Sequence, residues 1–295
     1  MIDSLLPPDF PWRPFIALLS FVLGACVGSF LNVCVYRIPR DLSVVAPRSF
    51  CPACSRQIPW YLNVPLLSWV MLRGRCRWCG ARISPRYVIV ELLVACLFLL
   101  VWLKHDLGAS PRLLGLSPIT DWRIVPVYWL AVSGLVLGTF VDFEHLIIPD
   151  RVTLGGIVAG LLLSGFLPSM HEETTVLRSL LWSSVGAGIG WGVLWATAAL
   201  GQLAFKKEAM GFGDVKLMGA IGAFLGARAV FFTIMCSSLL GSVVGISLVM
   251  FGRKQMQSRI PYGPYLALAA LLWMLWGPYF WNLYVSMVTP NVSVY

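Results

Sequence analysis

Ile124-Val-Pro-Val-Tyr-Trp-Leu-Ala-Val-Ser-Gly-Leu-Val-Leu-Gly-Thr-Phe-Val141 is a continuous stretch without one charged side chain, and Asp142 follows it directly. A helix that crosses the hydrocarbon core of a bilayer needs about 20 predominantly apolar residues, so this stretch is long enough to form one. A carboxylate at the end of such a span costs free energy unless it is paired or hydrated. The stretch therefore predicts a membrane-spanning helix with a functional candidate at its end.

Similar apolar runs recur along the chain and predict an all-α polytopic membrane protein with about eight transmembrane helices. Gly226-Ala227-Arg228 separates the sixth run from the seventh. The sixth is glycine-rich and could be a broken or partly re-entrant helix, which is tolerated only where protein covers the freed backbone groups. The expected spans are residues 15–36, 87–103, 124–141, 152–167, 180–203, 215–225, a seventh that ends near 251, and 265–285.

Composition favours a membrane protein over a nucleic-acid-binding one. Of the 295 residues, 58% are hydrophobic and 12% are charged, whereas a soluble domain carries about a quarter charged residues. Lys and Arg on cytoplasmic loops explain the formal net charge of +9. No basic stretch is interleaved with stacking aromatic residues, as a nucleic-acid site would require. The first run lacks a small-residue cleavage site, so we expect a retained helix and not a signal peptide.

Basic residues predict the orientation in the membrane. Segment 37–86 contains nine arginines and one acid, Asp41. The positive-inside rule predicts that this segment is cytoplasmic and that both termini lie outside. The cytoplasmic side then holds sixteen of the 22 basic residues, of which those outside the segment are Arg151, Lys206, Lys207, Lys216, Arg253, Lys254 and Arg259.

The same segment contains two Cys-x-x-Cys pairs, Cys51/Cys54 and Cys76/Cys79, with 21 residues between them. Two such pairs at this spacing are typical of a tetrahedral zinc site. Four thiolates leave no open position for water or substrate, so we expect a structural ion. A redox dithiol or a vacant site is the alternative, and disulfides are disfavoured by a reducing cytosol.

Few acids remain to be explained, and two groups of them fall at cytoplasmic span ends. Asp142, Glu144 and Asp150 follow the third span, and Asp214 begins the sixth. The predicted topology returns Asp142 and Asp214 to one membrane face. Two adjacent carboxyl groups cannot both ionise easily, so one could activate a water while the other donates to a developing oxyanion. Gly211 and Gly213 would let the backbone approach a substrate closely.

Structural roles for these acids stay open from the residues alone. Asp150 would suit a helix N-cap. Asp214 could instead pair with Lys216 or Arg151.

A series of motifs, in order along the chain, resembles the bacterial type IV prepilin peptidases, which are aspartic proteases with a Gly-x-Gly-Asp signature. Gly211-Phe-Gly-Asp-Val-Lys216 is similar to that signature, and residues 142–150 resemble the family's first aspartate motif. The other matching stretches are residues 28–39, the two cysteine pairs, 85–91 and 261–266. The resemblance covers nearly the whole chain.

The resemblance implies an enzyme of the bacterial inner membrane that removes the short basic leader of type IV prepilins or type II secretion pseudopilins. It also implies methylation of the new N-terminal residue with S-adenosylmethionine. Asp142 and Asp214 would be catalytic. Supporting roles would fall to Gly211, Gly213, Lys216, Asp150, Glu144 and Glu91.

A basic leader should not be attracted to nine arginines, so we expect those arginines to face anionic lipid. Glu144 and Glu208 are then the candidates for binding the leader.

Two other functions remain open at this point. A protease similar to signal-peptide peptidase or presenilin would cleave within a transmembrane helix, but such proteases lack the four-cysteine segment. A transporter or assembly factor could use a zinc module to dock a partner. We expect three parts in the chain: a first helix (1–36), the zinc segment (37–86) and a protease core (87–295).

Overall fold

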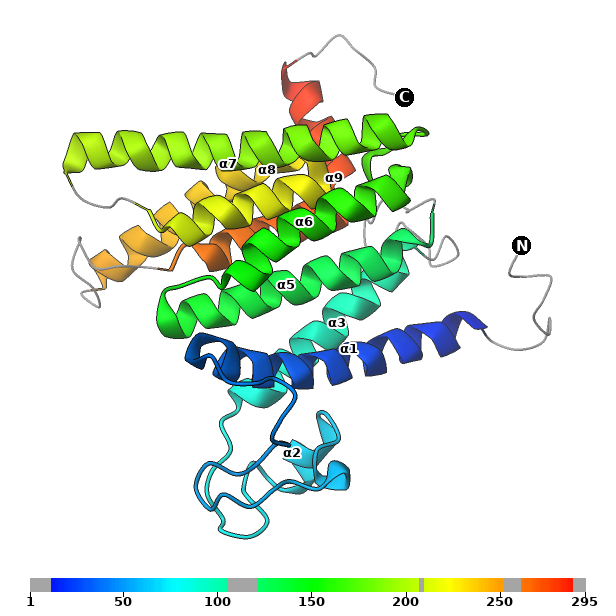
Figure 1. Ribbon diagram of the computed structural model, residues 1–295, viewed down its shortest axis with the longest axis vertical. Helices are drawn as coiled ribbons and strands as arrows, with labels where there is room; N and C mark the ends of the chain where they lie inside the picture. The colour runs from blue at the N-terminus through cyan, green and yellow to red at the C-terminus, as the bar shows by residue number, and fades with distance from the viewer. Residues whose placement is uncertain (1–11, 106–120, 207–209, 252–260, 289–295) are drawn as a thin grey trace.

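The computed structural model describes residues 12–105, 121–206, 210–251 and 261–288, and nearly all of its regular structure is helical (Figure 1). Six described helices are long and apolar enough to cross a membrane. They are α1 (Trp12–Arg37), α3 (Arg86–His105), α5 (Ile124–His145), α7 (Val176–Phe205), α8 (Phe212–Met250) and α9 (Gly263–Val288). A seventh, α6 (Asp150–Phe166), is shorter, with 17 residues, and packs beside α8.

Helix α8 contains two of the expected spans. Its 39 residues would measure about 58 Å if straight, roughly twice the hydrocarbon core. The chain reverses at Gly226, where φ is +79° and ψ is 176°, a conformation that favours glycine. Figure 1 shows both ends of α8 on the same side of the bundle. The eight expected spans therefore correspond to the six long helices, α6, and the second half of α8, and the sixth span is helical from Phe212 to the reversal.

Small residues let α7 and the first half of α8 approach closely. A Cβ atom on Gly186 would lie 2.3 Å from the carbonyl oxygen of Gly222, and one on Gly190 would lie 2.5 Å from that of Met218. Packing of this kind is common between helices in membranes, where apolar burial supplies no driving force between them. Ser183 on α7 also donates a hydrogen bond of 2.8 Å to the carbonyl of Ala223, near the reversal.

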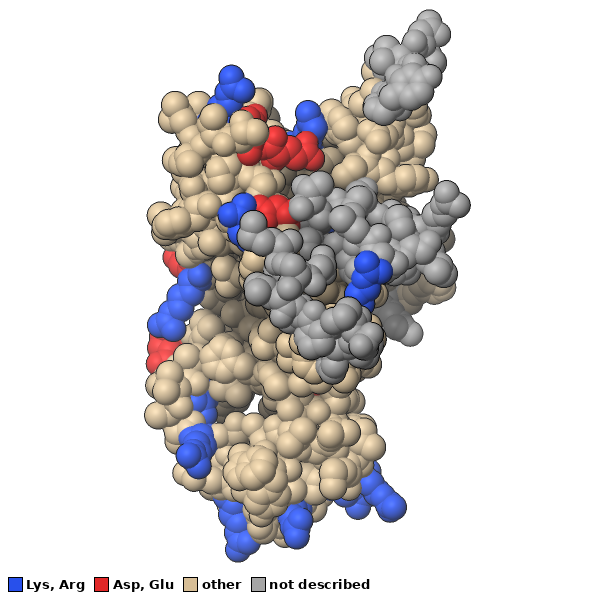
Figure 2. All heavy atoms as spheres, turned by 90° about the vertical axis from the view of Figure 1, so that its right-hand side faces the viewer, with Lys and Arg blue, Asp and Glu red and all other residues tan. Residues whose placement is uncertain are grey.

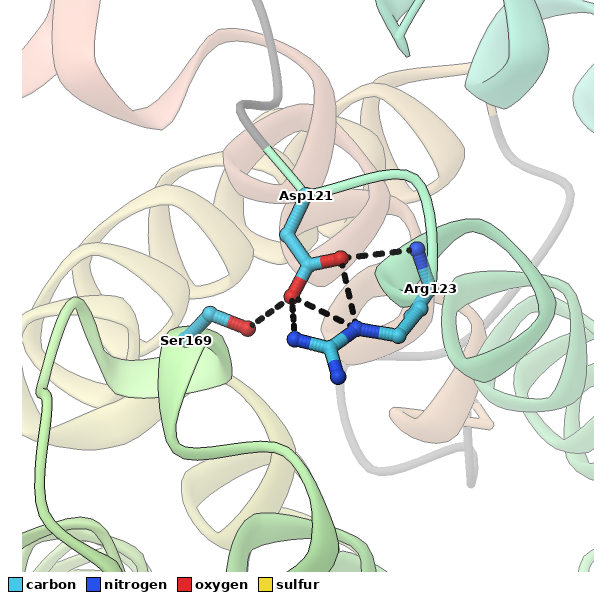
Figure 3. A network of polar contacts seen from close by, with 3 residues as sticks. All are labelled: Asp121, Arg123 and Ser169. Carbon is cyan, nitrogen blue, oxygen red and sulfur yellow. Dashed lines mark hydrogen bonds and ion pairs between the residues drawn. The ribbon is translucent and has the colours of Figure 1, made fainter. Parts of the chain in front are cut away.

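A short polar network holds the reversal end of the bundle (Figure 3). Arg123, before α5, forms an ion pair of 2.8 Å with Asp121, and Ser169 of η3 (Pro168–His171) donates to the same carboxylate at 2.7 Å. The Arg123 guanidinium holds the pKa of Asp121 well below its usual range. His171 at the end of η3 lies against Gly226. The network therefore connects the start of α5 to the turn of α8.

The four-cysteine segment, residues 38–85, lies alongside α1 at the level of its C-terminal half (Figure 1). It contains η1 (Ile38–Arg40), η2 (Trp60–Leu62) and α2 (Leu67–Met71). The buried side chain of Arg37 donates to the carbonyl oxygens of Ser43 at 2.9 Å and Pro47 at 2.7 Å, which holds the chain as it leaves α1.

Helix α9 is kinked, and a lysine from another helix satisfies the backbone group that the kink frees. Pro278 lies inside α9 and has no N–H for the carbonyl of Met274 four residues earlier. Trp276 has non-helical torsion angles. The buried side chain of Lys104 on α3 donates a hydrogen bond to that carbonyl. The stabilising effect of Lys104 is therefore expected to depend on the presence of Pro278.

We expect Lys104→Met to destabilise the protein more in the natural background than in a Pro278→Ala background. Restoring an N–H at position 278 gives Met274 its own helical partner, and an unsatisfied buried carbonyl costs about 1–3 kcal/mol. Thermal unfolding of the four chains of this double-mutant cycle in detergent measures the coupling. Equal effects of Lys104→Met in both backgrounds would contradict this pairing.

Candidate functional site

The last turn of α5 positions Asp142. Its carboxylate is 5% exposed and accepts a hydrogen bond of 3.1 Å from the backbone N–H of Gly263, the first residue of α9. A Cβ atom on Gly263 would lie 2.8 Å from this carboxylate oxygen and 3.0 Å from the side chain of Ile148. Only glycine therefore fits at position 263 without displacing Asp142 or Ile148.

The first turn of α8 positions Asp214, whose side chain is 8% exposed. Gly211 precedes the helix in an extended conformation and accepts the N–H of Asp214 at 3.1 Å. A Cβ atom on Gly211 would come within 3.3 Å of the Asp214 carboxylate, and one on Gly213 would come within 3.3 Å of Ile148. Gly211 thus leaves room beside the Asp214 carboxylate, and Gly213 lets the start of α8 pack closely against Ile148, in the turn between α5 and α6.

Asp142 and Asp214 come together at the end of the bundle where α5 turns into α6, which we call the α5–α6 end. Ile148, in that turn, contacts both Gly213 and Gly263 and so joins the two backbones that flank the carboxylates. The two aspartates are close enough to interact electrostatically. In the described part of the chain, no basic side chain forms an ion pair with either of them. We call Asp142 and Asp214 the aspartate pair.

Tyr262 anchors the segment that supplies the Gly263 amide. Its hydroxyl hydrogen-bonds Ser237 at 2.7 Å and Ser238 at 3.3 Å, both in the returning half of α8. Ser237 is fully buried. The amide that contacts Asp142 is therefore held by α8 through the adjacent tyrosine.

Lys216 and Asp150 form a second contact between the two aspartate motifs. The Lys216 ammonium lies 2.6 Å from the Asp150 carboxylate, which connects the starts of α8 and α6. Asp150 is the first residue of α6, after Pro149 at the N-cap position. Lys216 thus pairs with Asp150 and not with Asp214.

The two predicted supporting glutamates have other partners. Glu144 forms an ion pair with Arg86, at the start of α3. Glu91 is buried in α3 and accepts the backbone N–H of Leu66 at 2.8 Å. No hydrogen bond or ion pair between described residues joins Glu91 to the aspartate pair. Glu208, the other candidate for leader binding, lies outside the described residues.

The four cysteines of the segment converge. Their Sγ atoms all lie within 4.8 Å of one another, with Cys51 and Cys79 3.9 Å apart and Cys54 and Cys76 4.0 Å apart. A tetrahedral ion with metal–sulfur bonds of about 2.3 Å requires sulfur atoms about 3.8 Å apart. This donor set therefore fits a metal ion.

The two cysteine pairs sit on matching turns. Ser55 donates its N–H to the carbonyl of Cys51 at 2.8 Å, and Gly80 does the same to Cys76 at 3.0 Å. Ser55 and Gly80 both have positive φ. The backbone N–H groups of Cys79 and then Trp78 lower the pKa of the Cys76 thiol, which favours the thiolate form of that cysteine.

Sequence reasoning missed Gly263, Tyr262, Ile148 and Arg86. The first two lie in Pro261-Tyr-Gly-Pro-Tyr-Leu266, a motif already noted but without a role, because a backbone amide has no signature of its own in a sequence. Close approach of a glycine was the one signal available.

Comparison with known proteins gives two family matches and many relatives. Residues 22–105 match the bacterial peptidase A24 N-terminal domain, and residues 129–246 match the type IV leader peptidase family. A prepilin leader peptidase/N-methyltransferase of Myxococcus xanthus is 40% identical over 85% of this chain and 68% of its own length. Proteins of the same name from Aeromonas salmonicida and Legionella pneumophila are 35% and 31% identical over 96% and 97% of this chain, and over 98% and 99% of their own lengths. No solved structure matches the chain.

We expect the purified protein to carry one metal ion per chain and Cys51→Ser to lose it, because three thiolates bind more weakly than four. Metal analysis of the purified chain measures this. Cys236→Ser, in α8 and outside the cluster, is the matched control and should retain the ion. A wild-type chain without metal would contradict the assignment.

Proposed function

The chain belongs to the type IV leader peptidase family, and we propose that it cleaves the basic leader from type IV prepilins or type II secretion pseudopilins. We further propose that it methylates the new N-terminal residue. The relatives named above carry both activities in their names. The single observation that most supports proteolysis is the aspartate pair, because two buried, adjacent carboxyl groups are the arrangement that aspartic proteases use.

The proposed cleavage uses one water and both members of the aspartate pair. One carboxylate takes a proton from the water as its oxygen attacks the carbonyl carbon of the scissile peptide bond. The other, protonated member donates to the carbonyl oxygen, where negative charge would otherwise build up. A proton then passes to the amide nitrogen as the carbon–nitrogen bond breaks. The hydrogen bond from the Gly263 N–H to Asp142 supports Asp142 as the member that is ionised first.

We propose that the α5–α6 end faces the cytoplasm of a bacterial inner membrane, with both termini on the other side. The excess of basic residues in the four-cysteine segment and in the loops near Lys206 supports this orientation. A prepilin leader waiting in the cytoplasm would then meet the aspartate pair at the membrane interface.

Zinc is the ion that we propose for the four cysteines, in a structural role. Four thiolates at tetrahedral spacing fill its coordination shell and leave no place for a substrate. S-adenosylmethionine is the proposed methyl donor, on the basis of the relatives' names alone. We also propose the division into a first helix (1–36), a zinc segment (37–86) and a protease core (87–295).

If Glu144 binds a basic residue of the leader, that residue must replace Arg86 as the ion-pair partner of Glu144. Arg86 neutralises Glu144 in the free protein, so a basic leader residue would displace one cation with another. Such an exchange costs less than uncovering an isolated carboxylate. We therefore propose that Arg86 pairs with Glu144 in the free protein and is displaced by a basic leader residue when substrate binds.

We expect Asp142→Asn or Asp214→Asn alone to reduce leader cleavage by about 10⁴-fold, because each carboxyl group performs a proton transfer that an amide cannot. Co-expression with a prepilin and measurement of mature pilin is the test. Asp41→Asn, at an exposed position outside the aspartate motifs, is the matched control and should retain most of the activity. Mass spectrometry of the pilin N-terminus reports methylation in the same samples. Continued cleavage by either of the first two variants would remove the pair from catalysis.

We expect Tyr262→Phe to lower kcat about fivefold with little change in KM, because one buried hydrogen bond that positions Gly263 is worth about 1 kcal/mol. Steady-state kinetics on a prepilin substrate measures the two constants. Tyr265→Phe, in the same motif, is the control and should behave as wild type. Ser237→Ala should reproduce the effect of Tyr262→Phe, and equal losses in both tyrosine variants would contradict a positioning role.

A further inference from the structure

The four-cysteine segment exposes large apolar side chains on two consecutive short elements. On η2, Trp60 is 81% and Tyr61 is 56% exposed. On α2, Leu67, Val70 and Met71 are 61%, 64% and 79% exposed. We call these five residues the apolar patch. A water-soluble domain rarely exposes so many large apolar side chains within one short stretch, and such exposure marks a surface that is covered by something else.

The three residues of α2 share one face of the helix. Leu67, Val70 and Met71 stand at positions i, i+3 and i+4, which lie next to one another on a helix surface. Trp69 lies on the opposite side and packs against Gly74, with its indole nitrogen 3.4 Å from the carbonyl of Ile83. Because Trp69 attaches α2 to the second cysteine turn, the apolar face of α2 is turned outward.

Glu91 fixes the start of α2 against the transmembrane bundle. Its carboxylate accepts the N–H of Leu66, the residue before α2, in a bond of 2.8 Å. Gly28 of α1 lets α3 approach at this point, since a Cβ there would lie 2.7 Å from the Cα of Glu91. The apolar patch therefore has a defined position relative to two membrane-spanning helices.

That position is beside the bundle and not beyond its end. Figure 1 shows the segment, α2 included, alongside the C-terminal half of α1. The outward residues of α1, such as Leu18 at 62% and Phe30 at 51%, are exposed to the same degree as the patch. Since α1 is long and apolar enough to cross a membrane, we expect its outward residues to face lipid, and the four-cysteine segment lies beside that helix.

The chemistry of the segment matches the boundary between lipid headgroups and acyl chains. Trp and Tyr are enriched there because one end of each ring is apolar and the other can hydrogen-bond. Seven arginines of the segment are exposed, and Figure 2 shows basic side chains around its outer rim, at the bottom of that view. These are Arg40, Arg48, Arg56, Arg73, Arg75, Arg77 and Arg82. Cations at this depth attract the phosphates of anionic lipids.

We propose that the apolar patch inserts into the bilayer surface at the α5–α6 end, so that the four-cysteine segment rests on the membrane and its exposed arginines contact anionic phospholipid. Elements of this kind bury an apolar face about 5–10 Å into the boundary between headgroups and acyl chains. The segment would then be an interfacial anchor joined to α3 by Glu91, and not a freely projecting domain.

Site-specific photo-crosslinking in the full-length protein tests the proposal. Met71 is replaced by benzoyl-phenylalanine in one chain, and Ala53, exposed in the first cysteine turn, is replaced in the control chain. Both are reconstituted into vesicles of phosphatidylethanolamine and phosphatidylglycerol and irradiated. We expect several-fold more phospholipid adduct at position 71 than at position 53. Equal yields, or adducts at position 71 with a second protein chain in place of lipid, would overturn insertion.

Two further variants separate the apolar from the ionic contribution. Met71→Asp combined with Val70→Asp should abolish most lipid adducts formed by benzoyl-phenylalanine at position 67, whereas Ala53→Asp should not. Bound metal, measured in each variant, shows that the segment still folds. Adduct yield should also fall when phosphatidylcholine replaces phosphatidylglycerol, and an unchanged yield would overturn the part assigned to the arginines. Neither readout depends on leader cleavage, so the proposed enzyme activity is tested separately.

Discussion

Burial of two carboxyl groups side by side is the constraint on which the rest of this structure depends. Asp142 and Asp214 are each less than a tenth exposed, and taking such groups out of water is costly unless the protein supplies hydrogen bonds or keeps one of them protonated. The Gly263 amide supplies one such bond. Glycines at positions 213 and 263 bring both backbones against Ile148, so the pair can form without a large side chain between its members.

Delivery of that amide requires the chain to return to the α5–α6 end after Asp214, where α9 begins at Gly263. The reversal at Gly226 achieves this return, since the second half of α8 runs back beside α9. Ser183, His171 and the Asp121–Arg123–Ser169 network surround the reversal at the far end of the bundle. Tyr262 completes the path by joining the returning half of α8 to the residue that contacts Asp142. Side chains at both ends of the bundle thus help to position the Gly263 amide against Asp142.

Much of this arrangement could be predicted from the sequence, because apolar runs and charge asymmetry are strong signals. The spans, the Gly226 break and the convergence of the four cysteines agree with expectation. Partners that are backbone groups could not be predicted: the amide of Gly263 and the amide of Leu66 look like any other in a sequence. Nor could the pairing of Arg86 with Glu144, 58 positions apart, since it depends on how α3 packs on α5. Lys216 had several possible partners, and only packing selected Asp150.

A peptide that mimics the tetrahedral intermediate gives the most direct test of the aspartate pair. A prepilin segment whose scissile amide is replaced by a hydroxyethylene group presents its hydroxyl where both carboxyl groups would act, and such analogues bind at least about 10²-fold tighter than substrates. The measurement is its binding to the wild-type chain and to chains carrying Asp142→Asn or Asp214→Asn. We predict tight binding to the wild type and its loss in both variants. Equal binding to all three chains would contradict the role given to this pair.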